Sequence, residues 1–134
     1  MKWSRAVAYA VQATVQLASD PGDRPIPCSK LAAEGDMPER FLLQILRCLV
    51  THGILHSARG VDGGYMMNRG SHEVSLLDVI EAVEGPLTPS VPHSGGLSPA
   101  SQKRLQKALQ EVTAAARKKL KAVKIAELLD NHDR

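Results

Sequence analysis

A glycine-rich turn near the middle of the chain limits the possible folds more than any other feature. The run RGVDGGY, from Arg59 to Tyr65, has three glycines in seven residues, and the flanking runs ILHSAR and YMMN are typical of short strands. This pattern predicts a small β-hairpin. A phosphate-binding loop would need a helix directly after its glycines, and YMMN reads as a strand instead. A tight turn accounts for the glycines, because such turns need positive φ, but it does not account for Arg59.

Three helices are predicted before the hairpin. Apolar residues recur at helical spacing after Ser4, and Asp20-Pro21-Gly22 ends that first helix. A short second helix begins near Pro27, and a third covers PERFLLQILRCLVTHG, with Gly53 as its stop. The buried face of the third helix is expected to consist of Phe41, Leu42, Ile45, Leu46 and Leu49.

Two further helices and a loop are predicted after the hairpin. Ser75 and Asp78 form a capping-box pattern at the start of SLLDVIEAVEG, and residues 86–98 are rich in proline and glycine. Ser98-Pro99 then opens a helix of about 24 residues, and a short terminal helix, KIAELLD, is expected to fold back. The long helix has one apolar stripe, made of Leu105, Leu109, Val112, Ala116, Leu120 and Val123.

The predicted fold is mainly α with a small β-hairpin: a winged helix-turn-helix head plus a long C-terminal dimerisation helix. We expect the head in residues 1–85, a Pro/Gly-rich loop in residues 86–98, and the dimerisation helix with the short terminal helix in residues 99–134. A helix of roughly 36 Å is longer than so small a core can cover, so its stripe is expected to pack against a second copy of the chain.

Composition excludes several classes of protein. Hydrophobic residues make up 43% and aromatic residues 3%, which favours an aliphatic, alanine-rich helical core. No apolar run is long enough for a membrane span, and the N-terminus does not resemble a signal peptide, so a cytoplasmic protein is expected. Two cysteines are too few for a disulfide framework. No nucleophile–base pair or carboxylate dyad stands out, so the chain is not expected to be an enzyme.

The third helix and the hairpin provide the predicted DNA-binding residues. The hairpin tip of a winged head points at the minor groove, where Arg59 beside Gly60 would meet concentrated negative potential. Arg40 can bond guanine or phosphate, and Gln44 can pair with adenine in the major groove. A solvated helix face and a solvated arginine are the alternatives. The polar face of the third helix also offers Glu39, Leu43 and Arg47, and phosphate contacts are expected from Ser29, Lys30, Lys2, Ser4 and Arg5.

The run from MPERFLLQILRCLV through RGVDGGY to SLLDVIEAVEGPL resembles the Rrf2 (IscR-like) family of bacterial winged helix-turn-helix transcriptional regulators. The resemblance extends from AVAYAVQATVQLA to KIAELL. It implies a dimer joined through the long helix that binds a palindromic operator. Arg59 and Gly60 match the family's minor-groove wing residues, and Gln44 and Arg40 fall where base and backbone contacts arise. Leu43 replaces a charged residue of some members, so the target sequence is not implied.

The chain departs from the cluster-binding members of that family. Those members place three closely spaced cysteines in the loop before the long helix, and here this loop has no cysteine and only His93 as a ligand. Those members take a further ligand from a nearby residue or from the first helix, and here Ala8 and Gln12 occupy the corresponding first-helix positions. One imidazole cannot replace the four ligands of a cluster. We therefore expect no iron–sulfur cluster and no other cofactor.

The two cysteines, Cys28 and Cys48, are expected to be small core residues. A redox-sensing pair is the alternative, because Cys28 lies near a helix N-terminus, which lowers the pKa of a thiol. Cys48, His52 and His56 have a four-residue spacing, but Gly53 ends the helix between the histidines, so no metal site is expected.

These observations predict a homodimeric, sequence-specific DNA-binding transcriptional regulator, acting as a repressor on a near-palindromic operator in double-stranded DNA. An effector of unidentified kind is expected near the Pro/Gly-rich loop. Residues 1–64 contain seven Lys/Arg against six Asp/Glu, so charge alone indicates DNA only weakly. A winged-helix protein-interaction module or co-regulator, or a thiol- or small-molecule-responsive sensor, therefore stays open.

Overall fold

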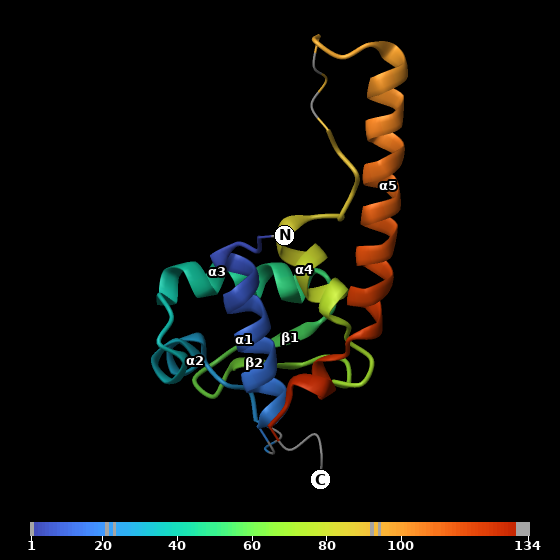
Figure 1. The fold of residues 1–134 in the computed structure, drawn as a ribbon. Helices are drawn as coiled ribbons and strands as arrows, with labels where there is room; N and C mark the ends of the chain where they lie inside the picture. Colours follow the sequence, from blue (N-terminus) through green and yellow to red (C-terminus); the bar gives the residue numbers. More distant parts are fainter. Residues whose placement is uncertain (1, 21, 23, 92, 94, 131–134) are drawn as a thin grey trace.

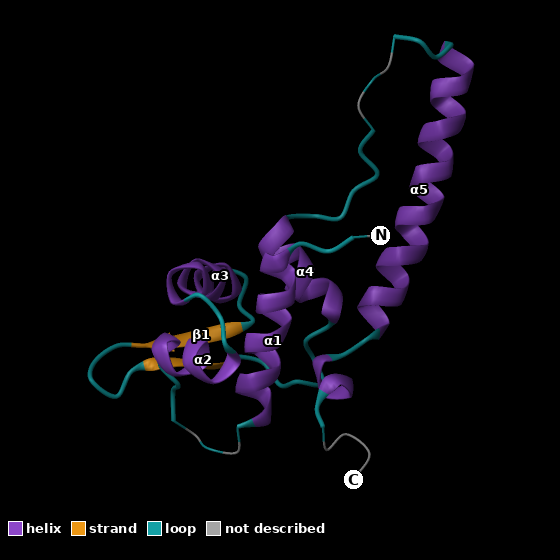
Figure 2. Cartoon of the chain, turned by 60° about the vertical axis from the view of Figure 1, so that its left-hand side comes forward, coloured by secondary structure: helices purple, strands orange, loops and turns teal. Residues whose placement is uncertain are grey.

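The order of helices and strands follows the predicted order. The computed structural model describes residues 2–20, 22, 24–91, 93 and 95–130. Its elements are α1 (Arg5–Ser19), α2 (Cys28–Gly35), α3 (Glu39–Thr51), β1 (Leu55–Ala58), β2 (Gly64–Met67), α4 (Leu76–Glu84), α5 (Pro99–Ala122) and the 3-10 turn η1 (Ile125–Leu128). Helices α1 to α4 and the hairpin form the head, and α5 rises away from it (Figures 1 and 2). Pro21, in the predicted stop of the first helix, lies outside the described residues, as do residues 131–134.

Side-chain caps begin three of the helices where the sequence predicts them. The Ser4 hydroxyl accepts a hydrogen bond from the Val7 amide at 3.3 Å, and the Ser98 hydroxyl accepts one from the Ser101 amide at 3.1 Å. Ser75 and Asp78 form the complete capping box, with both hydrogen bonds at 3.0 Å. These bonds satisfy amides that the first turn of a helix leaves unpaired.

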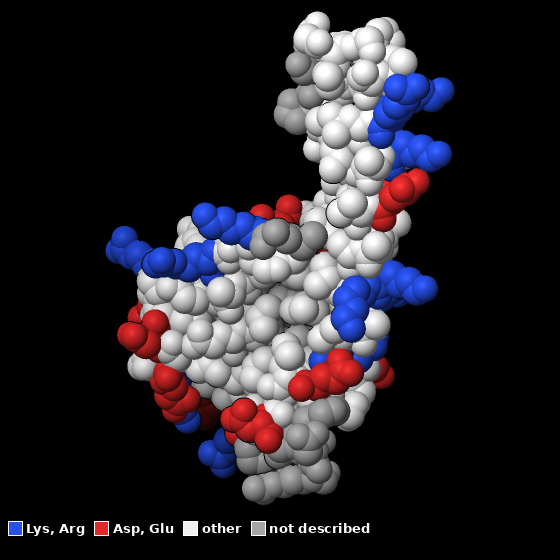
Figure 3. Space-filling model, in the orientation of Figure 1, with Lys and Arg blue, Asp and Glu red and all other residues white. Residues whose placement is uncertain are grey.

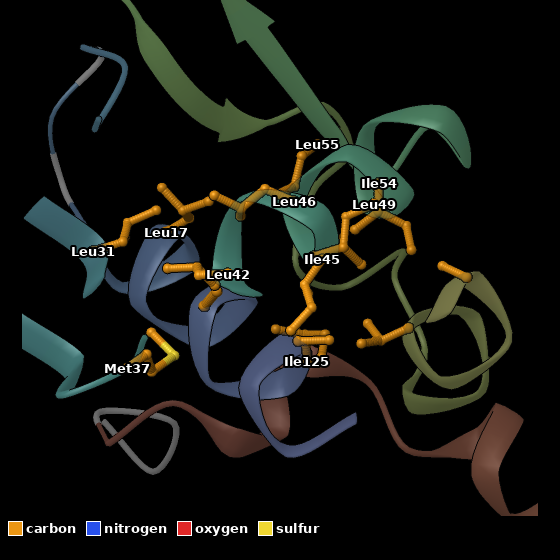
Figure 4. Close-up of a cluster of buried hydrophobic side chains, with 14 of the residues drawn as sticks. Leu17, Leu31, Met37, Leu42, Ile45, Leu46, Leu49, Ile54, Leu55 and Ile125 are labelled. Atoms are coloured by element: carbon orange, nitrogen blue, oxygen red, sulfur yellow. The ribbon is translucent and has the colours of Figure 1, made fainter. Parts of the chain in front are cut away.

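The core of the head is aliphatic, and α3 supplies its centre (Figure 4). Leu42, Leu46 and Leu49 are fully buried. Phe41 was expected on this buried face, and that prediction is wrong because its side chain is 37% exposed. Phe41 lies about 100° around the helix from Leu42, at the border of the buried face. There its ring contacts the edge of Tyr9 on α1, with ring centroids 5.8 Å apart.

The hairpin is fixed to the head through its second strand. β1 and β2 pair antiparallel, with Leu55 opposite Met67 and Ala58 opposite Gly64. Tyr65 also exchanges two backbone hydrogen bonds with Ile26, of 2.9 and 2.8 Å, from the segment before α2. A Cβ on Gly64 would lie 2.4 Å from the carbonyl carbon of Ile26. Glycine is therefore required where the hairpin meets this segment.

The chain returns to the head after α5. The Leu76 amide donates to the carbonyl of Val123 at 2.8 Å, and the Ile125 amide donates to that of Val74 at 2.9 Å. The Ile125 side chain is fully buried. The predicted folding back of the terminal segment is confirmed, although it forms one 3-10 turn, η1, rather than an α-helix. Within the described residues, every helix is too short or too polar to cross a bilayer.

Candidate nucleic-acid interface

The polar face of α3 is exposed, as its periodicity predicts. Glu39, Arg40, Gln44 and Arg47 are exposed, whereas Leu43 is half-buried. The opposite face of the same helix enters the core. The side chains of Arg40 and Gln44 form no hydrogen bond or ion pair with any residue that the structure describes. Their donors are therefore available to a partner.

The turn of the hairpin, residues 59–63, presents a second exposed cation. Gly60 has a φ of 102°, and the Gly63 amide donates to the Gly60 carbonyl at 3.0 Å. A Cβ on Gly63 would lie 2.4 Å from the Ala58 carbonyl oxygen, so this turn also requires its second glycine. Arg59 is exposed, and its side chain has no polar partner in the described part of the chain. We call residues 59–63 the wing tip.

The wing tip, α2 and α3 lie on the side of the head away from α5 (Figure 2). Partial burial raises the pKa of the Tyr65 phenol, the nearby Cys28 sulfur raises it further, and the positive charge of Arg47 has the opposite effect. The backbone of Tyr65 on β2 pairs with Ile26, two residues before α2 begins at Cys28, and the Cys28 sulfur lies 3.7 Å from the Glu39 carbonyl oxygen of α3. The base of the wing is therefore joined through the start of α2 to the start of α3.

The predicted phosphate contacts fall into two separate places. Ser29 and Lys30 are exposed in the first turn of α2, and the Lys30 ammonium lies 4.0 Å from Glu34 in an exposed ion pair. Lys2 and Ser4 instead lie beside the end of α4. They lie at the start of α1, which is about 22 Å long because its 15 residues rise by 1.5 Å each, and the other end of α1, at Leu17 and Ala18, lies beside Tyr65 at the base of the wing.

Ser4 is less available than the sequence suggests. Its hydroxyl donates to Glu84 while it caps α1, so both of its hydrogen-bonding roles are used within the head. Lys2 and Arg5 are exposed on the same end of α1. Most of the Lys and Arg side chains visible on the left of the head gather over α3 and the start of α1, and most of the acidic side chains visible there lie lower (Figure 3). The uneven distribution gives a nearly neutral head a basic edge.

Cys28 does not have the environment of a reactive thiol. It is half-buried, with its sulfur 3.7 Å from the Glu39 carbonyl oxygen. Burial raises the pKa of the Cys28 thiol above its ordinary value, and the Glu39 carboxylate raises it further. The expected lowering of this pKa by the start of α2 is therefore wrong, because burial, and after it the negative charge of Glu39 on α3, disfavours the thiolate. Cys48 is also half-buried.

This environment predicts slow alkylation of Cys28. In a Cys48→Ser variant, iodoacetamide should react with Cys28 more slowly at pH 8 than with a cysteine in an unstructured peptide, because only the thiolate reacts. Since the pKa is raised, the rate should keep increasing at pH values where the peptide rate has levelled off. Glu39→Gln should speed the reaction at pH 8 by removing the negative charge. A rate equal to or above that of the peptide would contradict this account.

The α5 stripe, defined as Leu105, Leu109, Val112, Ala116 and Leu120, is largely uncovered. Val112 is 57% exposed and Leu105 is 36% exposed. The other three residues are half-buried. All of α5 is described, and none of its residues is buried. The stripe therefore presents apolar surface that its own chain does not cover.

The side chains do not provide a ligand set for an iron–sulfur cluster. The two cysteines lie on α2 and α3, and His93 is the one ligand-type side chain in the sequence of residues 86–98, before α5. Three or more His, Cys, Asp or Glu side chains do not gather into a metal-binding group anywhere in the described ranges. The donor set therefore does not fit the four-ligand requirement of such a cluster.

A comparison with protein families gives one family match over nearly the whole chain. The model of the family Rrf2, described as an iron-dependent transcriptional regulator, matches residues 3–131. The Mycobacterium tuberculosis protein Rv1287, named as an HTH-type transcriptional regulator, is 39% identical over 87 residues, which are 65% of this chain and 54% of Rv1287. The chain thus spans about half the length of this relative.

Two solved structures share the fold over almost the entire chain. The oxidized form of Staphylococcus aureus CymR superimposes with a TM-score of 0.73 at 27% identity and covers 97% of both chains. IscR of T. potens superimposes with a TM-score of 0.66 at 26% identity, covering 98% of this chain and 88% of its own.

Proposed function

Because this chain belongs to the Rrf2 family of transcriptional regulators, we propose that it is a homodimeric, sequence-specific DNA-binding protein that represses transcription at a near-palindromic operator. Its family and relatives are transcriptional regulators, which confirms the sequence resemblance and the expectation that it is not an enzyme. The observation that carries the proposal is the pair of exposed donor sets, on α3 and on the wing tip, on the same side of the head.

The two donor sets suit different grooves. α3 has the width to enter the major groove, where Gln44 and Arg40 would meet base edges or phosphates. Arg59 extends from a narrow turn and would enter the adjacent minor groove, where the phosphates of both strands increase the negative potential. Ser29 and Lys30 would contact phosphate and fix the position of α3. Lys2 and Arg5 can do so only if the DNA extends past the start of α1.

Dimerisation would follow from the α5 stripe. Covering Leu105 and Val112 with the same residues of a second copy removes apolar surface from water and joins two heads. The two recognition helices would then bind half-sites about 34–36 Å apart, or a multiple of that distance, on one face of the duplex. A dimer bound to such an operator would block access of the polymerase, and on this basis we propose that the protein represses transcription. The proposed place of action is the cytoplasm.

We further propose that regulation does not use an iron–sulfur cluster, because the donor set does not fit one. An effector near residues 86–98 would then act by changing the relative positions of the two heads. Its chemical class stays open.

Selection of bound sequences from random duplex DNA tests the proposed function, followed by a salt titration on the selected sequence. The expected result is a near-palindromic sequence. The logarithm of its binding constant should fall linearly with the logarithm of the salt concentration, with a slope of about −0.9 for each phosphate contact. Absence of any enriched sequence at low ionic strength would contradict the proposal.

A protein-interaction module is the second candidate, and the charge of the head favours it. Residues 1–64 have seven basic and six acidic side chains, a small excess for a DNA-binding head. This candidate predicts no enrichment of any DNA sequence, and no effect of Arg59 on oligonucleotide binding.

A further inference from the structure

Arg117, on the lower half of α5, joins three parts of the chain. Its guanidinium donates to a carboxylate oxygen of Glu81 on α4 at 2.5 Å, and to the backbone carbonyl of Leu87 at 3.2 Å. The same Glu81 oxygen accepts the Leu87 amide at 2.7 Å. We call these three residues the Arg117 clamp. Arginine suits this place because its planar group can donate to two acceptors at once.

A second attachment lies at the C-terminal end of α5. Val123 hydrogen-bonds to Leu76, the first residue of α4, and Ile125 hydrogen-bonds to Val74 just before it. The Ile125 side chain is also buried in the core. This attachment fixes one end of the helix. It does not by itself fix the direction in which α5 leaves the head, since a single fixed end permits tilting.

Helix α5 also packs against α4 of the head. No residue of α5 is buried, however, so this packing is more exposed than the packing within the core, and the hydrogen-bonded Arg117 clamp adds a directional contact to it. Figure 1 shows its upper half rising clear of the head, with the segment that leads into it alongside. There Gln106 donates to the Pro89 carbonyl at 2.9 Å, a contact with that segment and not with the head.

We propose that the Arg117 clamp sets the angle between α5 and the head, and through it the spacing of the operator half-sites that a dimer accepts. The proposal rests on the proposed function, in that it takes α5 as the dimer contact. Arg117 and Glu81 are therefore positioning residues for DNA recognition, although they lie far from the wing tip and the exposed face of α3.

The lengths along α5 show why one contact has a large effect. Arg117 lies six residues, or about 9 Å, from Val123, whereas Pro99 lies 24 residues, or about 36 Å, from it. A tilt that moves Arg117 by about 1 Å therefore moves the far end of the helix by about 4 Å. One base pair is about 3.4 Å of duplex, so a tilt of this size changes which half-site spacing fits.

The first measurement compares affinities for operators whose half-sites are separated by the selected spacing or by one or two base pairs more or fewer. The unmodified chain is expected to prefer one spacing by about tenfold or more, and Arg117→Ala and Glu81→Gln should reduce that preference to about threefold or less. Lys118→Ala is the matched control, because it removes an exposed positive charge from the adjacent position of α5. Light scattering and circular dichroism check that each variant is a folded dimer.

The second measurement needs no DNA. Spin labels are attached to cysteines placed at Ala33 on α2 and Arg104 on α5, both exposed, in a Cys28→Ala, Cys48→Ala background. Labelled chains are diluted with unlabelled chains, so that the distance within one chain is measured. Arg117→Ala should broaden or shift the distance distribution, and Lys118→Ala should leave it unchanged.

The two measurements separate the clamp from the proposed function. An unchanged distance distribution in Arg117→Ala would overturn the role of the clamp. The same conclusion would follow if Arg117→Ala kept the spacing preference of the unmodified protein. A broadened distribution in a protein that selects no DNA sequence would support the clamp as the fixed joint of α5, and would reject the proposed function instead.

Discussion

Arg59→Ala is expected to weaken binding of the selected operator by about 1–3 kcal/mol, or roughly 5- to 150-fold. The physical reason is the place of this side chain. Arg59 extends from a glycine turn that is fixed to the head through Tyr65 and Ile26, and no described residue uses its donors. A narrow groove between two phosphate backbones attracts such a cation strongly. Alanine removes the charge but leaves the turn intact, because the turn depends on its glycines.

Fluorescence anisotropy with a labelled operator at fixed salt measures this effect. Arg104→Ala is the control, because Arg104 is an exposed arginine on α5 and lies outside the proposed DNA-binding surface of α3 and the wing tip. The slope of affinity against salt should also become shallower for Arg59→Ala, by up to about one. Equal affinities for Arg59→Ala and the unmodified protein would show that the wing does not enter the groove.

Val112→Asp is expected to dissociate the proposed dimer and to reduce affinity for the full operator by about 100-fold or more. An aspartate at the centre of the α5 stripe would lose its hydration in a helix–helix contact without gaining a partner. A separated head loses the local concentration effect of its linked partner, which is commonly worth 10²–10⁴ in avidity. The fold of the single chain should persist, because Val112 is 57% exposed and does not contribute to the core.

Lys118→Asp provides the matched control for that variant. It introduces the same aspartate about 1.7 turns further along α5, on the face opposite the centre of the α5 stripe. Sedimentation equilibrium should give a monomer for Val112→Asp and a dimer for Lys118→Asp, with similar helix content by circular dichroism. If the Val112→Asp protein stays dimeric, the two copies meet through another surface.

The exposure of Phe41 and the environment of Cys28 show where inference from the sequence fails. Helical spacing placed Phe41 with the buried leucines, but it lies at the border of that face and contacts Tyr9 on another helix. Cys28 follows a proline at a helix start, and that local position indicates a lowered thiol pKa. Burial and Glu39, eleven residues away, raise it. Both errors come from contacts with a different helix.

The starts of the helices, the hairpin turn and the identity of the family were determined by the sequence alone. Ser4, the Ser75–Asp78 capping box, Ser98 and the glycines after Arg59 act through hydrogen bonds and torsion angles within a few residues, so their effects can be read locally. Only the tertiary structure decided that Ile125 completes the core of the head, that Tyr65 pairs with Ile26, and that Arg117 joins α5 to Glu81 and Leu87. Such contacts join residues 30 to more than 100 positions apart in the chain, and no local spacing rule specifies which distant residues meet when the helices pack.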